Sequence, residues 1–270
     1  MTMPYAEVIG DPVIHSKSPL IHNFWLKKLG VQADYRACHV LSDGLEAYFA
    51  LRRDDPDWRG CNITIPHKIA ALNYVSDPGG VRDTIGAINT VAHGPDAKMF
   101  GTNTDAAGFL GPILDLPLEG APIVVIGSGG AAQAILFALA QVGCGTVTIL
   151  ARNALKAAAL LARFDLKGEV KTLGARLPRA ALLVNASPLG MKGQPALELD
   201  LAPLGEDAVV YDIVYAPLET GLLKAARTRG LETVDGLEML VGQAALAFEL
   251  FFDVAPPEGY DDVLRALLIQ

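Results

Sequence analysis

Apolar residues in the first part of the chain alternate between the spacing of strands and the spacing of helices. Residues 5–9 form a β-branched run that predicts a strand, and Gly10-Asp11-Pro12 ends it. A helix is predicted next, with Ser18 as its N-cap, Pro19 at its first position and Gly30 at its end. Its apolar face recurs at helical spacing and consists of Ile21, Phe24, Trp25 and Leu29.

The same alternation continues to about residue 101. We expect strands near residues 33–40, 61–65, 87–92 and 99–101, the last two joined by His93-Gly94-Pro95-Asp96. We expect helices near residues 43–51 and from Pro66 to about Tyr74. This order predicts an α/β sheet with helices over its faces.

The pattern changes around Pro117. A helix is expected to begin at residues 103–105, with Thr104 as candidate N-cap, and to reach Pro117. The following segments are predicted as a strand at 123–126, a glycine turn, an alanine-rich helix at 131–142, and strands at 146–150, 182–185, 208–211 and 232–234. This order predicts a second, doubly wound domain.

Residues 237–270 are predicted to be helical, because apolar residues recur on one face: Leu240, Ala244, Ala247, Phe248 and Phe251. The pattern alone allows this tail to cap the second domain or to return to the first, and we expect that it returns. The predicted domains are therefore residues 1–104 with 237–270, and residues 105–236.

Composition limits the class of protein. A chain of 270 residues is long enough for two domains, and 51% apolar with 19% charged residues is typical of a globular protein. Mean hydropathy is +0.32, yet no apolar run approaches the roughly 20 residues of a membrane-spanning helix. Residues 1–11 lack the pattern of a signal peptide, so we expect a cytoplasmic location.

Charge and cysteine usage exclude further classes. The net charge is −8 and no basic block occurs, which argues against nucleic acid or an anionic membrane as partner. Cys38, Cys61 and Cys144 lie far apart without a CxxC pair, so we expect reduced thiols, no disulfide and no structural metal.

The glycine turn carries a candidate dinucleotide site. Gly127, Ser128, Gly129, Gly130 and Ala131 follow an apolar strand and open a helix, which is the setting in which such a turn binds a pyrophosphate. The alternative is a turn that only packs a helix on a strand. The next strand ends at Ala151-Arg152-Asn153, with Lys156 close behind and no acidic residue before Asp165. The missing acidic residue and the two basic residues favour NADP over NAD. The alternative is that the two basic residues only lie on an exposed helix start and bind no cofactor.

Short polar clusters lie at the predicted ends of elements, where binding groups are common. They are Ser16–Ser18, Asn62–Lys68, Ala87–Thr90, Asn103–Asp105, Asn185–Met191, Tyr211–Tyr215 and Gly236–Gln243. Two serines at a helix start suit a carboxylate, and a lysine suits the oxygen of a ketone that is being reduced. Lys68 would lie in the first turn after Pro66, where the helix dipole disfavours a cation by about 0.3–1 kcal/mol, so its presence there suggests function.

Other residues near these clusters carry weaker signals. Asp105 is a common helix-start residue when taken alone, and its value lies in pairing with Lys68. His15 and His67 are expected to pack or bond locally, and Tyr215 to line a cleft.

These clusters, in this order and together with the Gly127–Ala131 turn, resemble those of the shikimate dehydrogenase family over the whole chain. The resemblance implies an N-terminal α/β substrate-binding catalytic domain and a Rossmann-like NADP-binding domain. It implies the reversible NADPH-dependent reduction of 3-dehydroshikimate to shikimate, in the pathway to aromatic amino acids, with Lys68 and Asp105 as acid/base pair. The implied substrate-binding residues are Ser16, Ser18, Thr64, Lys68, Asn89, Asp105, Tyr215 and Gln243. The implied cofactor-binding residues are Gly127, Ser128, Gly129, Gly130, Ala131, Ala151, Arg152, Asn153, Lys156, Ile213 and Gly236.

The chain departs from the family pattern at three places. Ala106 stands where the family usually has Gly, Ala151-Arg152-Asn153 replaces a common Asn-Arg-Thr, and Lys156 replaces a common Arg. The last two changes bear on adenosine contacts and therefore on cofactor preference. Alternatives are a quinate/shikimate dehydrogenase of relaxed specificity and a non-catalytic dinucleotide-binding protein. The expected partner is a small-molecule substrate, and the expected state is a monomer or homodimer.

Overall fold

A computed structural model describes residues 3–94 and 98–270, and within them the chain folds into two compact units. Unit 1 runs to Thr104 and includes Val241–Gln270, and unit 2 is Asp105–Leu240. The C-terminal helices thus return to the first unit, as predicted. Within the expected hairpin loop His93–Asp96, residues 95 and 96 lie outside the described part of the chain.

The sheet of unit 1 mixes parallel and antiparallel strands. Its strands, in the spatial order β2-β1-β3-β4-β5, are β2 Asp34–His39, β1 Tyr5–Gly10, β3 Trp58–Ile63, β4 Thr90–His93 and β5 Met99–Thr102. The two neighbours of β1 run parallel to it, whereas β4 and β5 are antiparallel to their neighbours. The carboxyl ends of β1, β2 and β3 therefore lie at one edge of the sheet, where loops can carry polar groups.

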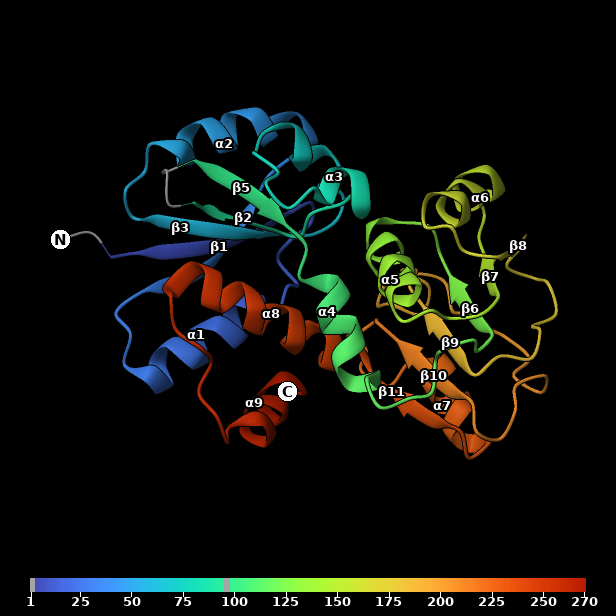
Figure 1. The fold of residues 1–270 in the computed structure, drawn as a ribbon. Coiled ribbons are helices and arrows are strands. Elements are labelled where there is room, and N and C mark those ends of the chain that lie inside the picture. Colours follow the sequence, from blue (N-terminus) through green and yellow to red (C-terminus); the bar gives the residue numbers. More distant parts are fainter. Residues whose placement is uncertain (1–2, 95–97) are drawn as a thin grey trace. The chain divides into compact units, whose positions relative to one another are not determined.

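Helices cover both faces of this sheet (Figure 1). One face carries α2 Leu45–Arg53, and the other carries α1 Ser18–Leu29 and α8 Gly236–Phe252. The remaining helices of the unit are α3 Val81–Thr84 and α9 Asp261–Leu268, with 3₁₀ turns at Ser42–Gly44 and Ala70–Asn73. Aromatic rings form the core under α1 and α8, where Trp25 meets Phe248 edge to face at 5.4 Å.

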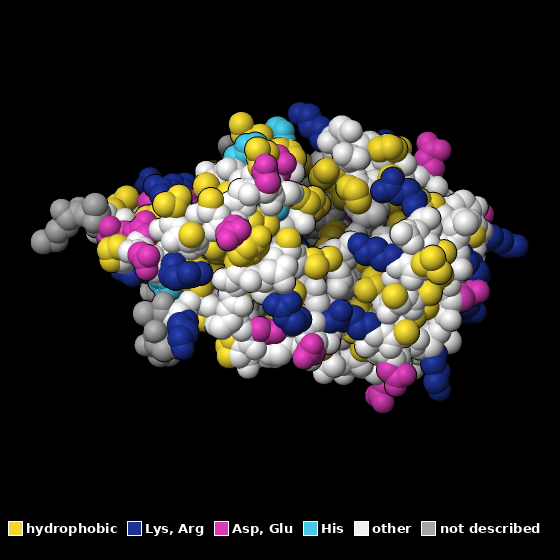
Figure 2. Space-filling model, turned by 90° about the horizontal axis from the view of Figure 1, so that it is seen from above, with side chains coloured by type: hydrophobic (Ala, Val, Ile, Leu, Met, Phe, Trp, Pro, Cys, Tyr) yellow, Lys and Arg dark blue, Asp and Glu magenta, His cyan; other side chains and the backbone are white. Residues whose placement is uncertain are grey.

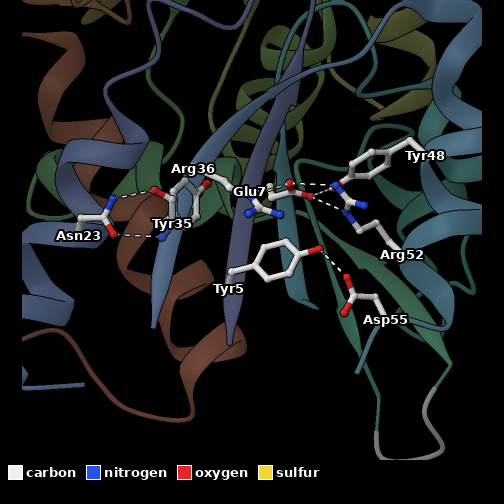
Figure 3. A network of polar contacts seen from close by, with 8 residues as sticks. All are labelled: Tyr5, Glu7, Asn23, Tyr35, Arg36, Tyr48, Arg52 and Asp55. Carbon is white, nitrogen blue, oxygen red and sulfur yellow. Dashed lines mark hydrogen bonds and ion pairs between the residues drawn. The ribbon is translucent and has the colours of Figure 1, made fainter. Parts of the chain in front are cut away.

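A buried carboxylate fixes α2 to the opposite face (Figure 3). Glu7 of β1 is 1% exposed and accepts hydrogen bonds from the Tyr48 hydroxyl at 2.8 Å and from Arg52 Nε at 2.8 Å. Arg36 of β2 adds an ion pair at 3.1 Å. Each carboxylate oxygen thus has a donor, which is the condition for burying a charge without a large penalty.

Unit 2 is a parallel sheet of the doubly wound type. Its spatial order is β11 Glu232–Val234, β10 Val209–Asp212, β9 Leu182–Asn185, β6 Ile123–Ile126, β7 Val147–Leu150 and β8 Gly168–Lys171. Along the chain the order runs outward from β6 to β8 and then outward from β9 to β11, so the direction reverses between β6 and β9. Ligands of such sheets bind at this switch point, outside the carboxyl ends of the strands.

The helices of unit 2 are α4 Asp105–Leu110, α5 Gly130–Gln141, α6 Ala154–Arg163 and α7 Gly221–Thr228, with a 3₁₀ turn at Gly111–Ile113. In Figure 1 the sheet separates α7 from α5 and α6. Every residue of β6, β7, β9 and β10 is buried, which explains why these strands are apolar runs without alternation. The predicted α/β class with a Rossmann-like second domain is confirmed.

Two predictions about helix starts are wrong. Ser18 does not cap α1: the N-cap is Lys17, whose carbonyl accepts from the amides of Leu20 and Ile21. No α-helix starts at Pro66: the segment forms turns and a 3₁₀ helix. The Lys68 carbonyl accepts from the distant Ile88 amide at 2.8 Å, so it is not available to continue a helix. Lys68 therefore lies in a turn and not at the start of an α-helix whose dipole would disfavour its charge.

Surface features agree with the charge pattern. Acidic and basic side chains are interspersed on the face shown in Figure 2. Among the residues described, no helix combines the length and the apolar character that crossing a membrane requires. The thiols of Cys38, Cys61 and Cys144 are all free.

Candidate active site

A buried cluster of amide and hydroxyl groups joins four segments of unit 1. Asn89, before β4, donates from Nδ2 to Thr104 Oγ1 at 2.8 Å and to Gln243 Oε1 of α8 at 3.2 Å. Its Oδ1 accepts from the Thr104 amide at 2.7 Å and from Thr90 Oγ1 at 3.1 Å. Asn89, Thr104 and Gln243 are at most 7% exposed, so these groups are held in fixed orientations.

The neighbouring strand end supplies further polar groups. Asn62 of β3 donates to Thr90 Oγ1 at 3.1 Å, and Thr64 follows directly after β3 with its amide bonded to the Ile9 carbonyl at 2.9 Å. Thr64 and Lys68 are half-buried. His67 between them is buried and its Nε2 lies 2.6 Å from the Val40 carbonyl oxygen, so it bonds locally as expected.

Ser16 and Ser18 lie at the start of α1. The Ser18 amide donates to Ser16 Oγ at 3.3 Å, and the Ser18 side chain is buried. Lys17 between them turns its ammonium to the Leu268 carbonyl of the C-terminal helix. The two serines therefore share one helix start, while the lysine between them is used to fix the tail.

Unit 2 holds Asp105, which is buried at the first position of α4, and the candidate nucleotide turn. Gly127 has φ +111, and a Cβ there would lie 2.8 Å from the Ala186 carbonyl oxygen. Gly129 is the N-cap of α5, and a Cβ there would meet no atom within 4 Å. The first glycine is required by the turn itself, whereas the second leaves open space beside the backbone amides of a helix start, where a pyrophosphate binds.

Basic residues surround the end of β7. Ala151 is buried, Asn153 caps α6 by accepting from the Lys156 amide at 3.0 Å, and Arg152 and Lys156 are exposed. An arginine and a lysine at a helix start form a site for a phosphate group.

The loop after β10 is tightly packed. A Cβ on Gly236 would lie 2.4 Å from the Ile213 carbonyl oxygen, so the two segments are in backbone contact. Asp212 accepts from Asn185 Nδ2 at 2.9 Å and from Thr220 Oγ1 at 2.7 Å, and burial raises its pKa. Tyr215 is half-buried, and burial raises the pKa of its hydroxyl. The Asn185–Asp212–Thr220 bonds join distant segments, so no local sequence signal predicts them.

Comparison with known proteins finds matches to one family at both ends of the chain. The family profile described as "Shikimate dehydrogenase substrate binding domain" matches residues 8–91, and "Shikimate 5'-dehydrogenase C-terminal domain" matches residues 236–268. A protein of Sphingopyxis alaskensis named "Shikimate dehydrogenase (NADP(+))" is 65% identical over 98% of this chain and 97% of its own length.

Solved structures agree. A shikimate dehydrogenase in complex with NADP⁺ superposes with a TM-score of 0.89 at 33% identity, covering 99% of this chain and 95% of that one. The Thermus thermophilus shikimate 5-dehydrogenase in complex with NADP(H) and shikimate superposes with a TM-score of 0.85 at 36% identity, covering 98% of this chain and 99% of that one. With a fold and a sequence that agree over nearly its whole length, this chain belongs to the shikimate dehydrogenase family.

Proposed function

We propose that the protein catalyses the reversible NADPH-dependent reduction of 3-dehydroshikimate to shikimate, a step in the synthesis of chorismate and the aromatic amino acids. The observation that carries this proposal is the 65% identity, along nearly the whole chain, to an NADP-linked shikimate dehydrogenase. Residues 1–104 with 237–270 form the substrate-binding catalytic domain in this proposal, and residues 105–236 form the NADP-binding domain.

The residues that bind substrate follow from its chemistry. Shikimate is a carboxylic acid with several ring hydroxyls, so it needs a site for an anion and a set of paired donors and acceptors. Ser16 and Ser18 at the start of α1 hold the carboxylate. The ring hydroxyls and the reacting oxygen are bound by Thr64, Lys68, Asn89, Asp105, Tyr215 and Gln243. Support comes from the Asn89–Gln243 hydrogen bond, which holds two of these side chains together.

The reduction requires one hydride and one proton. The nicotinamide of bound NADPH supplies the hydride to the carbonyl carbon. Lys68 Nζ donates the proton to the carbonyl oxygen, and in the reverse direction it accepts the proton from the hydroxyl. Asp105 orients the Lys68 ammonium and stabilises its charge. A half-buried lysine suits this role because it reaches a binding site yet can exchange its proton with water.

The nucleotide residues fit the cofactor. Gly127, Ser128, Gly129, Gly130 and Ala131 would hold the pyrophosphate, since the start of α5 offers amides beside open space at Gly129. The 2′-phosphate would bind to Arg152 and Lys156, with Ala151 and Asn153 beside the adenosine. Ile213 and Gly236 would line the nicotinamide end. NAD-binding domains of this fold use an acidic residue to hydrogen-bond the ribose 2′-hydroxyl, and this chain has no acidic residue between the end of β7 and Asp165.

An absorbance assay at the NADPH band tests the proposal. Turnover of 3-dehydroshikimate with NADPH, and of shikimate with NADP⁺, is expected to exceed turnover of quinate and of NAD⁺ by more than tenfold. Comparable rates with quinate would favour the relaxed quinate/shikimate dehydrogenase, and no turnover with tight NADP⁺ binding would favour a non-catalytic binding protein. We also propose a cytoplasmic location and a monomer or homodimer, which fractionation and light scattering test.

A further inference from the structure

Tyr35 of β2 is held by two residues of helix α1. The Asn23 side chain bonds both backbone groups of Tyr35, donating to its carbonyl at 2.6 Å and accepting from its amide at 3.0 Å (Figure 3). The His22 ring stacks on the Tyr35 ring with centroids 3.9 Å apart and planes at 5°. Ser18 lies about one helical turn before His22, at the first position of the same helix. Because β2 is an edge strand, the backbone groups on its outer side need partners, and Asn23 supplies them while the His22 stack fixes the Tyr35 ring.

The Tyr35 hydroxyl in turn contacts the polar cluster around Asn89. It donates to Asn62 Oδ1 at 2.6 Å, and both residues are buried. Asn62 Nδ2 donates to Thr90 Oγ1 at 3.1 Å, and Thr90 Oγ1 donates to Asn89 Oδ1 at 3.1 Å. We call this chain of Tyr35, Asn62, Thr90 and Asn89 the Tyr35 relay.

The direction of every bond in the Tyr35 relay is fixed from one end. The Thr104 amide can only donate, and it points at Asn89 from 2.7 Å, so the oxygen of the Asn89 amide must be the atom that faces it. Thr90 then uses its single hydrogen toward that oxygen and must accept from Asn62. Asn62 therefore turns its nitrogen to Thr90 and its oxygen to Tyr35, and the Tyr35 hydroxyl must donate.

The proposed substrate site has one part that binds the carboxylate and another that binds the ring hydroxyls. Tyr35 contacts structural elements that carry both parts. At one side is Ser18, which would bind the carboxylate, and at the other is Asn89, which would bind a ring hydroxyl. The Tyr35 ring stacks on His22 of α1 and its hydroxyl bonds to Asn62, so Tyr35 sets the spacing between the start of α1 and the groups around Asn89. Spacing matters because a rigid ring acid must satisfy both ends at once.

We propose that Tyr35 is a positioning residue for the substrate, which acts through its contacts with α1 and through the Tyr35 relay to hold the carboxylate-binding and ring-binding groups at matched distance and orientation. The inference rests on the proposed function. Without the hydroxyl, Asn62 Oδ1 loses its donor in a buried site, and an Asn62 flip would reverse its bond to Thr90.

The test compares two buried tyrosines of unit 1. Tyr35→Phe keeps the stack on His22 and removes only the hydroxyl. Tyr48→Phe is the matched control, because the Tyr48 hydroxyl is also buried and donates to a buried carboxylate, Glu7, at 2.8 Å (Figure 3). Each is assayed for shikimate oxidation with NADP⁺, for shikimate Kd by calorimetry and for thermal stability.

We expect Tyr35→Phe to weaken the binding of shikimate and to leave the binding of NADP⁺ unchanged. Tyr35→Phe raises the KM and Kd for shikimate by about five- to tenfold, the effect of one buried hydrogen bond, and leaves the KM for NADP⁺ within twofold. Tyr48→Phe lowers thermal stability and leaves both KM values within twofold. The positioning role is overturned if the shikimate KM is unchanged in Tyr35→Phe, or if it rises equally in Tyr48→Phe. In either case, activity of the wild type still upholds the proposed function.

A second pair of variants covers the case in which Tyr35→Phe does not fold. Thr90→Val is nearly isosteric and removes the middle hydroxyl of the Tyr35 relay, and Thr90→Ser restores it. We expect Thr90→Val to raise the shikimate KM by about fivefold or more and Thr90→Ser to return it to within twofold of wild type. Equal KM values for the two variants overturn the inference. Absence of shikimate turnover in the wild type overturns the proposed function and this inference with it.

Discussion

The backbone at Gly127 passes so close to Ala186 that a Cβ on the glycine would lie 2.8 Å from the Ala186 carbonyl oxygen. Gly127 follows β6 and Ala186 follows β9, so this contact lies at the switch point of the parallel sheet. The contact and the positive φ both require glycine, which separates the structural role of Gly127 from the role of Gly129.

Two alanine variants should distinguish these roles. Gly127→Ala is expected to lower the free energy of unfolding of unit 2 by about 1–3 kcal/mol, because it strains the backbone and meets a carbonyl oxygen. Gly129→Ala has ordinary φ and free space around it, so stability should change by about 0.5 kcal/mol or less, while the Kd for NADP⁺ should rise at least fivefold. Calorimetric melting and NADP⁺ titration measure both. Equal NADP⁺ affinity in Gly129→Ala and the wild type would show that the turn does not meet the pyrophosphate.

Replacement of the proposed proton donor should affect turnover rather than cofactor binding. Lys68→Ala is expected to lower kcat by about 10²- to 10⁴-fold, the usual contribution of a general acid. The Kd for NADPH should stay within threefold, because Lys68 belongs to unit 1 and the nucleotide turn to unit 2. Steady-state rates and NADPH fluorescence titration measure the two quantities. The control is Lys192→Ala, which replaces a lysine outside the polar clusters of the proposed site. A Lys68→Ala enzyme with the wild-type kcat would refute the assignment of Lys68 as proton donor.

Cofactor preference should depend on the start of α6. Arg152→Ala is expected to raise the KM for NADP⁺ by about 10- to 100-fold, since it removes charge-assisted bonds to the 2′-phosphate. The KM for NAD⁺ should change less than threefold. Arg163→Ala, at the last turn of the same helix, removes an equal charge and should change neither value. The ratio of kcat/KM for the two cofactors is the measurement, and a parallel loss with NAD⁺ would mean that Arg152 contacts the shared part of the dinucleotide.

The buried His22 should make unit 1 sensitive to acid. Burial lowers the pKa of His22 from 6.5 to about 3, and its two nitrogens have no hydrogen-bond partner. The unfolded chain therefore binds a proton below about pH 6.5 that the folded chain refuses until about pH 3. Unfolding is favoured as the pH falls through this window, by about 2 kcal/mol between pH 7 and pH 5 for this group.

Trp fluorescence measures this effect in unit 1, because Trp25 and Trp58 both belong to it. Urea unfolding at pH 7, 6 and 5 should show a pH slope that His22→Gln reduces by close to one proton. His15→Gln, which alters an exposed loop histidine, should keep the wild-type slope. An unchanged slope in His22→Gln would show that His22 is protonated in the folded protein.

Some features could be predicted from the sequence because they depend on neighbours along the chain. The strands at residues 182–185 and 232–234 lie at their predicted positions, and β6 and the glycine turn do as well. A strand buried on both faces is an apolar run whatever its partners are, and a turn with positive φ needs glycine wherever it occurs. The polar clusters could also be predicted, because they lie at the ends of predicted elements.

Other features were decided by contacts between distant segments. Ser18 and the segment after Pro66 carry local signals for a helix cap and a helix, yet Lys17 caps α1 and the Lys68 carbonyl bonds to Ile88. The strand expected at residues 61–65 is β3 Trp58–Ile63, because its register is set by pairing with β1 rather than by its own apolar run, which Arg59 and Gly60 interrupt. The region predicted as a strand at residues 87–92 begins only at Thr90, since Ile88 and Asn89 bond to Lys68 and Thr102.

The sequence by itself determined an α/β sheet followed by a doubly wound domain, the glycine turn and the types of side chain available for binding, since these follow from local periodicity and from glycine and charge at fixed positions. Only the tertiary structure decided which donors the side-chain oxygens of Asn62 and Asn89 face, and that Tyr35 links helix α1 to Asn62. The physical reason is that a hydrogen bond is directional and short, so its partners are chosen by the packing of segments that are remote in sequence.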